Sequence, residues 1–565
     1  MLEPIVKVTN SDISIVPNVQ KNKEQVLHKF VFSNLKKEKA SIEYRVPLVD
    51  IQYVWHPLSD GKYALNNEWD LPINIKVNQS LPVICLFNQS NKSKFSVAAS
   101  ELVSEINLTV GVHEESASVK IVFEFLIPAD KYELTLSLMG ENPIWSEVVQ
   151  NQVKWLYDFN DVKVKKSPIS AYQPVLSTWY SFHQQVSQEE IYQEAVDYQE
   201  LGTETIILDD GWQTDDGQRR YAYAGDWEIS KNKFPDFQKH IKEIQSLGMK
   251  YLIWLSLPYI GIKAQKWEAL KSDLLYIDDF QRAGILDLRS DYVREILKQT
   301  IREFLNEFPM DGLKLDFFET FSLDEENNRE IAESLLQFLS ELEELFPQGR
   351  DFLVEYRQDY INPLMMQFAN IIRAKDCPNN LYLNRIRTID LRLSCPYTAV
   401  HSDMIMWNKL EPVESAALQI INVLFSVPQL SVRYETLTKD EKQMVKFWLS
   451  FVKTYQVELL KEEITPLNPQ EGYSQVSVGG KKREIIVNYS ENKIITPLYD
   501  SNEMIIINGT YAESIWLKVQ TGNYKLIILD CMGNEIKKEN VTFETNRIVE
   551  FTVPLSGLIF MHAMK

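Results

Sequence analysis

The sequence predicts a central (β/α)8 barrel flanked by an N-terminal β-sandwich and a small C-terminal antiparallel β domain. Three observations support this fold class. Apolar and polar residues alternate with a period of two in the first part of the chain. Apolar strand-like runs then alternate with amphipathic helical stretches, and strand patterning returns near the end. We therefore expect three domains, at residues 1–168, 169–465 and 466–565 of the 565-residue chain.

The first predicted domain contains short runs in which every second residue is apolar. Examples are Ile42–Val46, Lys120–Phe125 and Tyr132–Leu136. In a strand, successive side chains point to opposite faces, so this alternation indicates sheets with one buried and one solvated face. The pattern predicts an antiparallel sandwich.

The second predicted domain carries eight apolar runs separated by helical stretches, the order typical of βαβ units. The predicted strands are Pro174–Phe182, Glu204–Asp210, Lys250–Leu257, Gly312–Phe318, Asp351–Arg357, Ala369–Ala374, Ala399–Met404 and Pro428–Arg433. Predicted helices include Glu189–Leu201, Phe237–Leu247, Tyr292–Phe308 and Asn328–Leu345. An additional strand-like run, Ala283–Leu288, lies in the long interval between the third and fourth strands.

The third predicted domain returns to strand-like runs, as in Ile485–Tyr489, Met504–Ile507 and Lys525–Leu529. These runs are rich in β-branched and apolar residues, which favour strands. They predict a compact β domain after the barrel.

Composition narrows the classes of function. The formal net charge is −20, from 59 basic and 79 acidic residues, which opposes binding to nucleic acid or to an anionic membrane. Four widely spaced cysteines form no metal-ligand motif, and we expect no metal and no cofactor. The N-terminal residues lack the pattern of a signal peptide, and no apolar stretch is long enough to span a bilayer. These features predict a cytoplasmic protein with a neutral small-molecule ligand.

The segment Asp311–Phe318 is the most informative part of the predicted barrel. It reads as a buried strand that ends in Lys314 and Asp316. Residues two apart share one face of a strand, so the ammonium of Lys314 should lower the pKa of Asp316 and keep it ionised. Asp316 is therefore a candidate nucleophile, and a structural salt bridge between the two is the alternative.

Polar or aromatic clusters also close most of the other predicted strands. They are Thr178–Tyr180, Leu208–Trp212, Trp254, Glu355–Asp359, Arg373–Asp376 and His401–Asp403. A parallel barrel brings the carboxyl ends of its strands to one mouth, where catalytic residues gather. Several carboxylates with Lys and Arg among them are the side chains that glycoside hydrolysis requires. In that reaction one carboxylate attacks the anomeric carbon, and another carboxyl protonates the leaving oxygen.

At these residues the sequence resembles glycoside hydrolase family 36, the α-galactosidases of clan D. The motifs occur in family order. They are Leu208-Asp209-Asp210-Gly211-Trp212, Gly225-Asp226-Trp227 followed by Lys233-Phe234-Pro235, Leu286-Asp287-Leu288, Leu313-Lys314-Leu315-Asp316 and Arg373-Ala374-Lys375-Asp376. The resemblance also covers the order of the three domains.

The resemblance implies a role for each matching residue. Asp316 becomes the nucleophile and Asp376 the acid/base, with a pKa that should be raised so that it holds a proton. The residues implied or predicted to contact the sugar are Asp209, Asp210, Trp212, Trp227, Trp254, Lys314, Arg373 and Trp179. Asp403 and Asp359 are alternatives to Asp376. The resemblance implies an oligosaccharide or glycoside as substrate and is compatible with a homo-oligomer.

Two segments depart from the family pattern. The third strand reads Trp254-Leu255-Ser256-Leu257-Pro258, without the two glutamates of typical members. The family's Gly-rich Cys-Ser-Gly-Gly segment is replaced by Glu355-Tyr356-Arg357-Gln358-Asp359, which adds Glu355 and Arg357 as candidate ligand contacts. The expected activity is thus a retaining, exo-acting α-galactosidase. Alternatives are another clan D α-glycosidase or transglycosidase, or a sugar-binding protein without catalysis.

Overall fold

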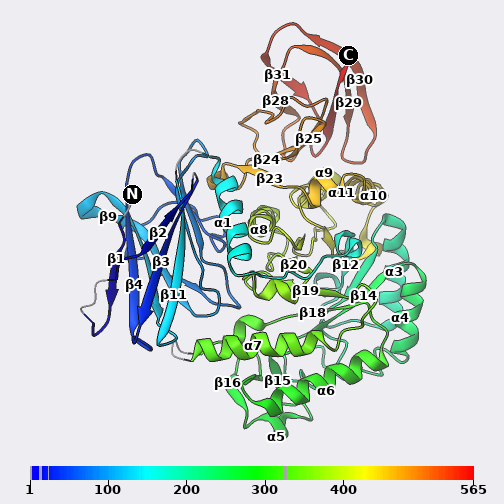
Figure 1. Ribbon diagram of the computed structural model, residues 1–565. Helices are drawn as coiled ribbons and strands as arrows, with labels where there is room; N and C mark the ends of the chain where they lie inside the picture. The colour runs from blue at the N-terminus through cyan, green and yellow to red at the C-terminus, as the bar shows by residue number, and fades with distance from the viewer. Residues whose placement is uncertain are drawn as a thin grey trace.

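The computed structural model describes residues 3–11, 15–22, 24–70, 72–140, 143–323 and 327–564. It confirms the predicted fold class of a (β/α)8 barrel between two β-rich regions. In Figure 1 the N-terminal sandwich (blue) lies beside the barrel (cyan to yellow), and the C-terminal sheets (orange to red) lie next to the helices α9 to α11.

The N-terminal region is a sandwich of two antiparallel sheets. One sheet has the order β1 (Ile5–Val8), β4 (Lys39–Pro47), β10 (Ser118–Leu126), β9 (Ile106–His113) and β6 (Ile73–Ile75). The other has the order β2 (Asn18–Lys21), β3 (Gln25–Ser33), β11 (Lys131–Met139), β8 (Ser93–Ala99), β7 (Val83–Phe87) and β5 (Tyr53–Trp55). Phe30 and Leu134 from one sheet pack with Ile42 and Phe123 from the other, so the period-two alternation correctly identified the core face.

One helix interrupts the region that was predicted to be all strand. Helix α1 spans Trp145–Phe159 and packs against β7 and β8. Val149, Val153 and Leu156 recur at a spacing of three to four and are fully buried, as expected for the inner stripe of a helix. The expectation that strand patterning continues to about residue 168 is therefore wrong for this stretch.

Eight parallel strands form the central sheet, one within each predicted run. Its order is β21 (Ala399–His401), β20 (Ile371–Arg373), β19 (Leu353–Arg357), β18 (Gly312–Leu315), β14 (Lys250–Leu255), β13 (Thr205–Leu208), β12 (Val175–Ser177) and β22 (Gln429–Leu430). Parallel bridges from His401 to Val427 and from Ile405 to Leu430 join the two ends of this order, β21 with the residues after it and β22 with the residues before it. The cylinder is thereby closed, and all carboxyl ends meet at one mouth.

The four predicted helical stretches are found nearly as expected, as α3 (Gln188–Leu201), α4 (Phe237–Ser246), α6 (Asp291–Glu307) and α7 (Asn328–Glu343). The barrel region also contains α2 (Trp179–Phe182), α5 (Trp267–Leu270), α8 (Leu381–Ser394), α9 (Val413–Ile421), α10 (Lys439–Thr454) and α11 (Gln456–Leu460). The first predicted strand was too long, because Trp179 begins α2 rather than continuing β12.

A small antiparallel sheet fills the long interval between the third and fourth barrel strands. It has the order β15 (Tyr259–Gly261), β17 (Ala283–Leu286) and β16 (Leu274–Asp278). The additional strand predicted at Ala283–Leu288 is thus found, outside the barrel sheet.

The C-terminal region contains two further sheets. The larger has the order β23 (Ile464–Leu467), β24 (Gln475–Gly479), β25 (Arg483–Asn488), β27 (Glu503–Asn508), β32 (Leu558–Met564), β29 (Gly522–Leu529) and β30 (Glu535–Phe543). The smaller has the order β26 (Ile494–Ile495), β28 (Ser514–Val519) and β31 (Arg547–Thr552). Strand β25 pairs with β27 in parallel, as does β26 with β28, so the prediction of a purely antiparallel domain is wrong. Within the described ranges, no helix combines the length and apolar character needed to cross a bilayer.

Candidate active site

A small pocket opens at the carboxyl ends of the barrel strands. Its enclosed volume is about 40 Å³. The lining residues are Trp179, Asp209, Asp210, Tyr221, Trp254, Lys314, Asp316, Phe317, Arg357, Arg373, Asp376 and Met404. Nine of the twelve residues predicted for the site therefore line one cavity, and the two candidate catalytic carboxylates share it.

Asp316 follows directly after β18 and is held from several directions. The indole Nε1 of Trp254 donates to Oδ2 at 3.2 Å. The hydroxyl of Tyr360 and the backbone N–H of Phe317 donate to Oδ1 at 3.1 and 2.9 Å. These contacts fix the orientation of the carboxylate while its side chain remains on the pocket wall.

An ion pair joins Asp316 to Arg357, at the end of β19. The guanidinium Nε lies 3.0 Å from Oδ1 of Asp316. Burial alone opposes ionisation of Asp316, but the charges of Arg357, Lys314 and Arg373 outweigh it and lower the pKa of this carboxyl to about 2. Asp316 is therefore ionised at neutral pH, as a nucleophile must be.

Arg357 has a second partner, since its Nη2 also contacts Glu319, in the short helical turn after Asp316. The guanidinium additionally lies over the ring of Phe317, 5.1 Å from its centroid. Burial raises the pKa of Glu319, against the lowering effect of Arg357. Arg357 thus bridges two carboxylates, and the guanidinium remains paired if Asp316 loses its charge.

Lys314 and Asp209 form a buried ion pair in the wall of the same pocket. Their side chains are 4 and 5% exposed, and the ammonium of Lys314 donates to Oδ2 of Asp209. Oδ1 of Asp209 accepts the backbone N–H of Asp210 at 3.0 Å. Lys314 therefore contributes to the low pKa of Asp316, as predicted, while its direct partner is Asp209 rather than Asp316.

Asp210 lies beside Asp209 in a polar cradle. The amides of Gln184 and Gln213 donate to its two oxygens at 2.6 and 2.7 Å. Burial raises the pKa of Asp210 to about 6 against the effect of these bonds. The chain bends here at Gly211, whose φ is +112°. This bend brings adjacent acidic residues to one cavity, as the sequence predicted.

The predicted tryptophans divide into two groups. Trp254 and Trp179 line the pocket, and Trp254 stacks on Tyr221 with ring centroids 5.8 Å apart. Trp212 and Trp227 stack on each other behind Trp254, and Nε1 of Trp212 donates to the backbone carbonyl of Trp254 at 3.1 Å. The structure thus does not bring Trp212 and Trp227 to the pocket wall, because both are packed in the core that supports it.

Asp376 lies in the loop after β20, with 41% of its side chain exposed. Nη2 of Arg373 is 2.9 Å from its Oδ1. Desolvation raises the pKa of Asp376, but Arg373, Arg357 and Lys314 together bring it below its ordinary value. The pKa of Asp376 is therefore lowered rather than raised as expected, because the positive charge of Arg373 stabilises the carboxylate.

Arg373 itself is buried and shared between three carboxylates. Its Nη1 donates to Asp403 at 2.6 Å, and its Nε lies 3.7 Å from Glu355. Asp403 is fully buried and also accepts from the hydroxyl of Tyr180 at 2.9 Å. Glu355 accepts from the amide of Gln429 at 2.6 Å and is absent from the pocket lining. Glu355 therefore supports Arg373 from below, and Asp403 is too enclosed to reach a leaving group.

Several residues that line or support the pocket were not among the residues predicted for the site. Tyr221 lies in the loop between β13 and α4, and Tyr360 lies after β19, where neither occupies a predicted strand end. Met404 and Phe317 also line the pocket. Phe317 and Met404 lie at the carboxyl ends of predicted strands, and Tyr360 directly follows the predicted cluster Glu355–Asp359, so a positional clue existed for these three residues but not for Tyr221.

Two further features lie away from the mouth. A larger cavity of about 600 Å³ opens where β19 and β20 begin, lined by Lys165, Lys166, Arg350 and Lys461 among others. Its residues precede the strands, on the face of a barrel that contributes to stability rather than catalysis.

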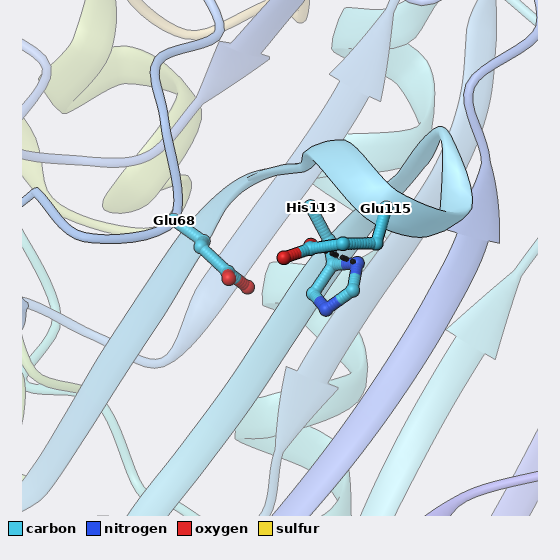
Figure 2. A group of neighbouring side chains, drawn as sticks. All are labelled: Glu68, His113 and Glu115. Atoms are coloured by element: carbon cyan, nitrogen blue, oxygen red, sulfur yellow. Dashed lines mark ion pairs between the residues drawn. The ribbon is translucent and has the colours of Figure 1, made fainter.

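A group of potential metal ligands lies on the sandwich. Figure 2 shows Glu68, His113 and Glu115 and the ion pair between His113 and Glu115. Nδ1 of His113 lies 3.3 Å from the carboxylate of Glu115. The ammonium of Lys120 lies 3.0 Å from Glu68, and the side chain of Glu115 is 80% exposed. The group has the composition of a surface ion-pair network, so we assign no metal to it.

The chain is similar to known proteins in part of its sequence and in its fold. A family model described as Melibiase matches residues 150–339. The chain is 25% identical over 153 residues to "Alpha-galactosidase AgaA" of Geobacillus stearothermophilus. This match covers 26% of this chain and 21% of that protein. The matched stretch thus spans about a fifth of the relative's length.

Solved structures extend the likeness of the fold to the whole chain. A variant of the GH36 α-galactosidase AgaA from Geobacillus stearothermophilus, solved in complex with stachyose, has a TM-score of 0.63 at 14% identity and covers 100% of this chain and 88% of its own. The α-galactosidase from Lactobacillus brevis has a TM-score of 0.65 at 12% identity, with 100 and 85% covered. The family model thus matches about a third of the chain, and the solved structures show that their fold extends over all of it.

Proposed function

We propose that this family 36 chain is a retaining, exo-acting glycoside hydrolase that removes terminal α-linked galactose. The observation that carries the proposal is the shared pocket of Asp316 and Asp376, which come from β18 and β20, on either side of β19. Asp209, Asp210 and Lys314 line the same pocket and offer charged partners for sugar hydroxyls.

In the proposed reaction, Asp316 attacks the anomeric carbon while Asp376 protonates the departing oxygen. The bond to the leaving group breaks as a galactosyl ester forms on Asp316. Asp376, now ionised, then removes a proton from water, which attacks the ester and releases the sugar with its configuration unchanged. The low pKa of Asp316 suits the attacking role.

Asp376 needs a proton to act as the acid, and the positive charge of Arg373 opposes this. A bound sugar displaces water and places an ether oxygen beside Asp376, which favours a neutral carboxyl over a carboxylate. We infer that substrate binding raises the pKa of Asp376, and that Arg373 then relies on Asp403 and Glu355 for charge balance.

The exo-acting mode is supported by the size of the pocket. The pocket is small, about 40 Å³, and its walls are the strand ends and loops of one barrel mouth, which suits a terminal sugar better than the interior of a polysaccharide chain. The net charge of −20 also suits a neutral rather than an anionic glycan.

The test is turnover of nitrophenyl α-galactoside, with Asp316→Ala as the control for contaminating activity. The proposal predicts release of nitrophenol and galactose by the wild-type protein alone. Absence of turnover with both this substrate and raffinose, together with calorimetric binding of galactose, would favour a sugar-binding protein instead.

A second candidate is an α-glycosidase of the same clan that acts on another sugar. It is favoured by Arg357, which stands in the segment that departs from the family pattern and contacts Asp316 directly. The corresponding α-glucoside, α-N-acetylgalactosaminide and β-arabinoside separate the candidates. The glycoside with the largest kcat/KM identifies the sugar. Transfer of that sugar to an added alcohol would identify a transglycosidase.

A further inference from the structure

An arginine on α8, Arg387, connects the loop that carries Asp376 to the N-terminal sandwich. Nη1 of Arg387 donates to the backbone carbonyls of Lys375 and Asp376, at 3.1 and 2.9 Å. The other face of the same guanidinium forms a two-point ion pair with Asp60, at 2.7 Å for both bonds. A carboxylate of the sandwich and the loop that carries Asp376 thus share one guanidinium.

This geometry restricts the guanidinium strongly. Its planar fork matches the carboxylate of Asp60 in two parallel bonds, and this arrangement is both stronger and more directional than a single ion pair. The side chain of Arg387 is 8% exposed. With Asp60 fixing the plane of the guanidinium, the remaining N–H groups of Arg387 point in one direction, toward the two loop carbonyls.

The segment that carries Asp60 is itself anchored on α8. Asp60 lies in the turn after β5, between Trp55 and Tyr63. The indole of Trp55 and the hydroxyl of Tyr63 both donate to Asp390, at 2.9 and 3.4 Å. Since Asp390 follows Arg387 by three residues, both contacts fall on one face of α8.

The turn also fits closely against the helix. Gly61 has a φ of +86°, and a Cβ at this position would lie 3.1 Å from Cδ1 of Ile386. Both the left-handed backbone and the close approach favour glycine here. The turn therefore packs directly against α8, in a conformation that favours glycine at position 61.

We propose that Asp60 and Arg387 are positioning residues for the acid/base step, through which the N-terminal sandwich holds the Asp376 loop in its working position. The inference deepens the proposed function and rests on the assignment of Asp376 as acid/base. Neither residue lines the pocket. Their effect passes through the backbone of Lys375 and Asp376, since carbonyls held at the loop restrict the reach of the carboxyl group.

Dependence on the leaving group separates positioning of an acid from general damage. A dinitrophenolate leaves without a proton, whereas the alkoxide of methyl α-galactoside or raffinose requires one. For Asp60→Asn we expect kcat/KM to fall about tenfold or more with methyl α-galactoside and by less than about threefold with dinitrophenyl α-galactoside. Asp60→Glu keeps the carboxylate and should recover part of the loss.

The matched control is Arg329→Gln, on α7. Arg329 also joins the barrel to the sandwich, through Glu101 at 3.7 Å and through Ser104, but it does not touch the Asp376 loop. The proposal predicts that this control leaves the ratio between the two substrates unchanged. An equal fall with both substrates in Asp60→Asn, or the same ratio change in Arg329→Gln, would overturn it.

A second readout does not depend on turnover. Hydrogen–deuterium exchange of the peptide covering residues 374–379 should become faster in Asp60→Asn and stay unchanged in Arg329→Gln. If the wild-type protein hydrolyses no glycoside, the proposed function fails while this measurement still decides whether the sandwich restrains the loop. Unchanged exchange in Asp60→Asn would refute the restraint even in an active enzyme.

Discussion

Asp316 is fixed at a strand end by Trp254, Tyr360 and Arg357, whereas Asp376 is carried by a loop and meets the guanidinium of Arg373. The side chain of Asp316 is 8% exposed and that of Asp376 is 41% exposed. A nucleophile must meet one carbon atom at a fixed point, and a rigid strand end provides this. An acid/base must reach first a leaving group and then water, and a loop provides that reach.

The comparison explains why the two carboxylates have different kinds of support. Asp316 depends on residues of the barrel itself, within β14, β18 and β19 and their loops. The loop of Asp376 depends on Arg387 and, through it, on Asp60 of the sandwich. The sandwich thus contacts both segments, but at different points. Arg387 connects Asp60 to the backbone carbonyl of Asp376 itself, whereas Asn78 donates to the carbonyls of Phe318 and Phe321, beyond Asp316.

Replacement of the nucleophile should have the largest effect. In Asp316→Ala no ester can form, so we expect kcat to fall by about three orders of magnitude or more with every galactoside. Added azide should restore part of the turnover and yield a galactosyl azide of inverted configuration, which NMR identifies. Wild-type turnover in a correctly folded variant would remove Asp316 from the mechanism.

Replacement of the acid/base should have a smaller effect that depends on the substrate. For Asp376→Ala we expect kcat/KM with methyl α-galactoside to fall by roughly 10²- to 10⁴-fold, and with dinitrophenyl α-galactoside far less. Asp359→Asn is the control, since Asp359 is an alternative acid that pairs with Lys375 at 2.8 Å. A stronger dependence on leaving group in Asp359→Asn would exchange the two assignments.

Removal of Arg357 should shift the pH dependence rather than abolish activity. Arg357 lowers the pKa of Asp316 and also that of Asp376. Without it both pKa values rise, so the acidic limb of kcat/KM, which reports ionisation of Asp316, moves to higher pH. The basic limb, which reports loss of the proton of Asp376, moves in the same direction. We expect shifts of about one pH unit in Arg357→Gln.

The control for this shift is Arg219→Gln, which removes a cation beside Trp179 at the mouth of the pocket. Arg219 is not among the groups that set the pKa of Asp316. A profile that moves equally in both variants would indicate a general loss of positive charge, and an unmoved profile in Arg357→Gln would separate Arg357 from the nucleophile.

The smallest expected effect concerns stability at the junction beside the acid/base loop. The carboxylate of Asp390 accepts hydrogen bonds from Trp55 and Tyr63 of the sandwich and from Tyr473 of the C-terminal region. Burial raises the pKa of Asp390 to about 7. Because the folded state favours the protonated carboxyl, the resulting stability is complete below about pH 4 and is lost as the pH rises through about 7.

Asp390→Asn removes this titration. We therefore expect the difference in Tm between wild type and Asp390→Asn to shift in favour of the variant between pH 5 and pH 8, by an amount that corresponds to roughly 1–3 kcal/mol. Thermal unfolding at the two pH values measures it. A difference that is independent of pH would show that Asp390 does not change its charge in this range.

Prediction from sequence succeeded where a residue's place in a strand determines its direction. Lys314 and Asp316 end β18, so the closed barrel necessarily brings both to the mouth. Trp212 and Trp227 were assigned to the pocket because they belong to family motifs, but a motif does not specify which side of Trp254 an indole occupies. The packing of the surrounding core decides that.

Long-range contacts were beyond the reach of local patterns. Asp60 and Arg387 are separated by 327 positions, and nothing near either residue indicates the other. Helix α1 was read as strand because its apolar residues are interspersed with polar ones at intervals that both periods partly fit. Most residues of the pocket could thus be predicted from the sequence, whereas the residues that hold them in place could be identified only from the three-dimensional structure.

Trapping of the intermediate tests the central assignment most directly. A fluorinated galactosyl fluoride forms the ester on the nucleophile but slows its hydrolysis, so the protein accumulates in the labelled form. After digestion, mass spectrometry should find one galactosyl label, on Asp316, and the first sugar released from an ordinary substrate should be the α anomer by NMR. A label on another residue, or β-galactose as the first product, would contradict the account.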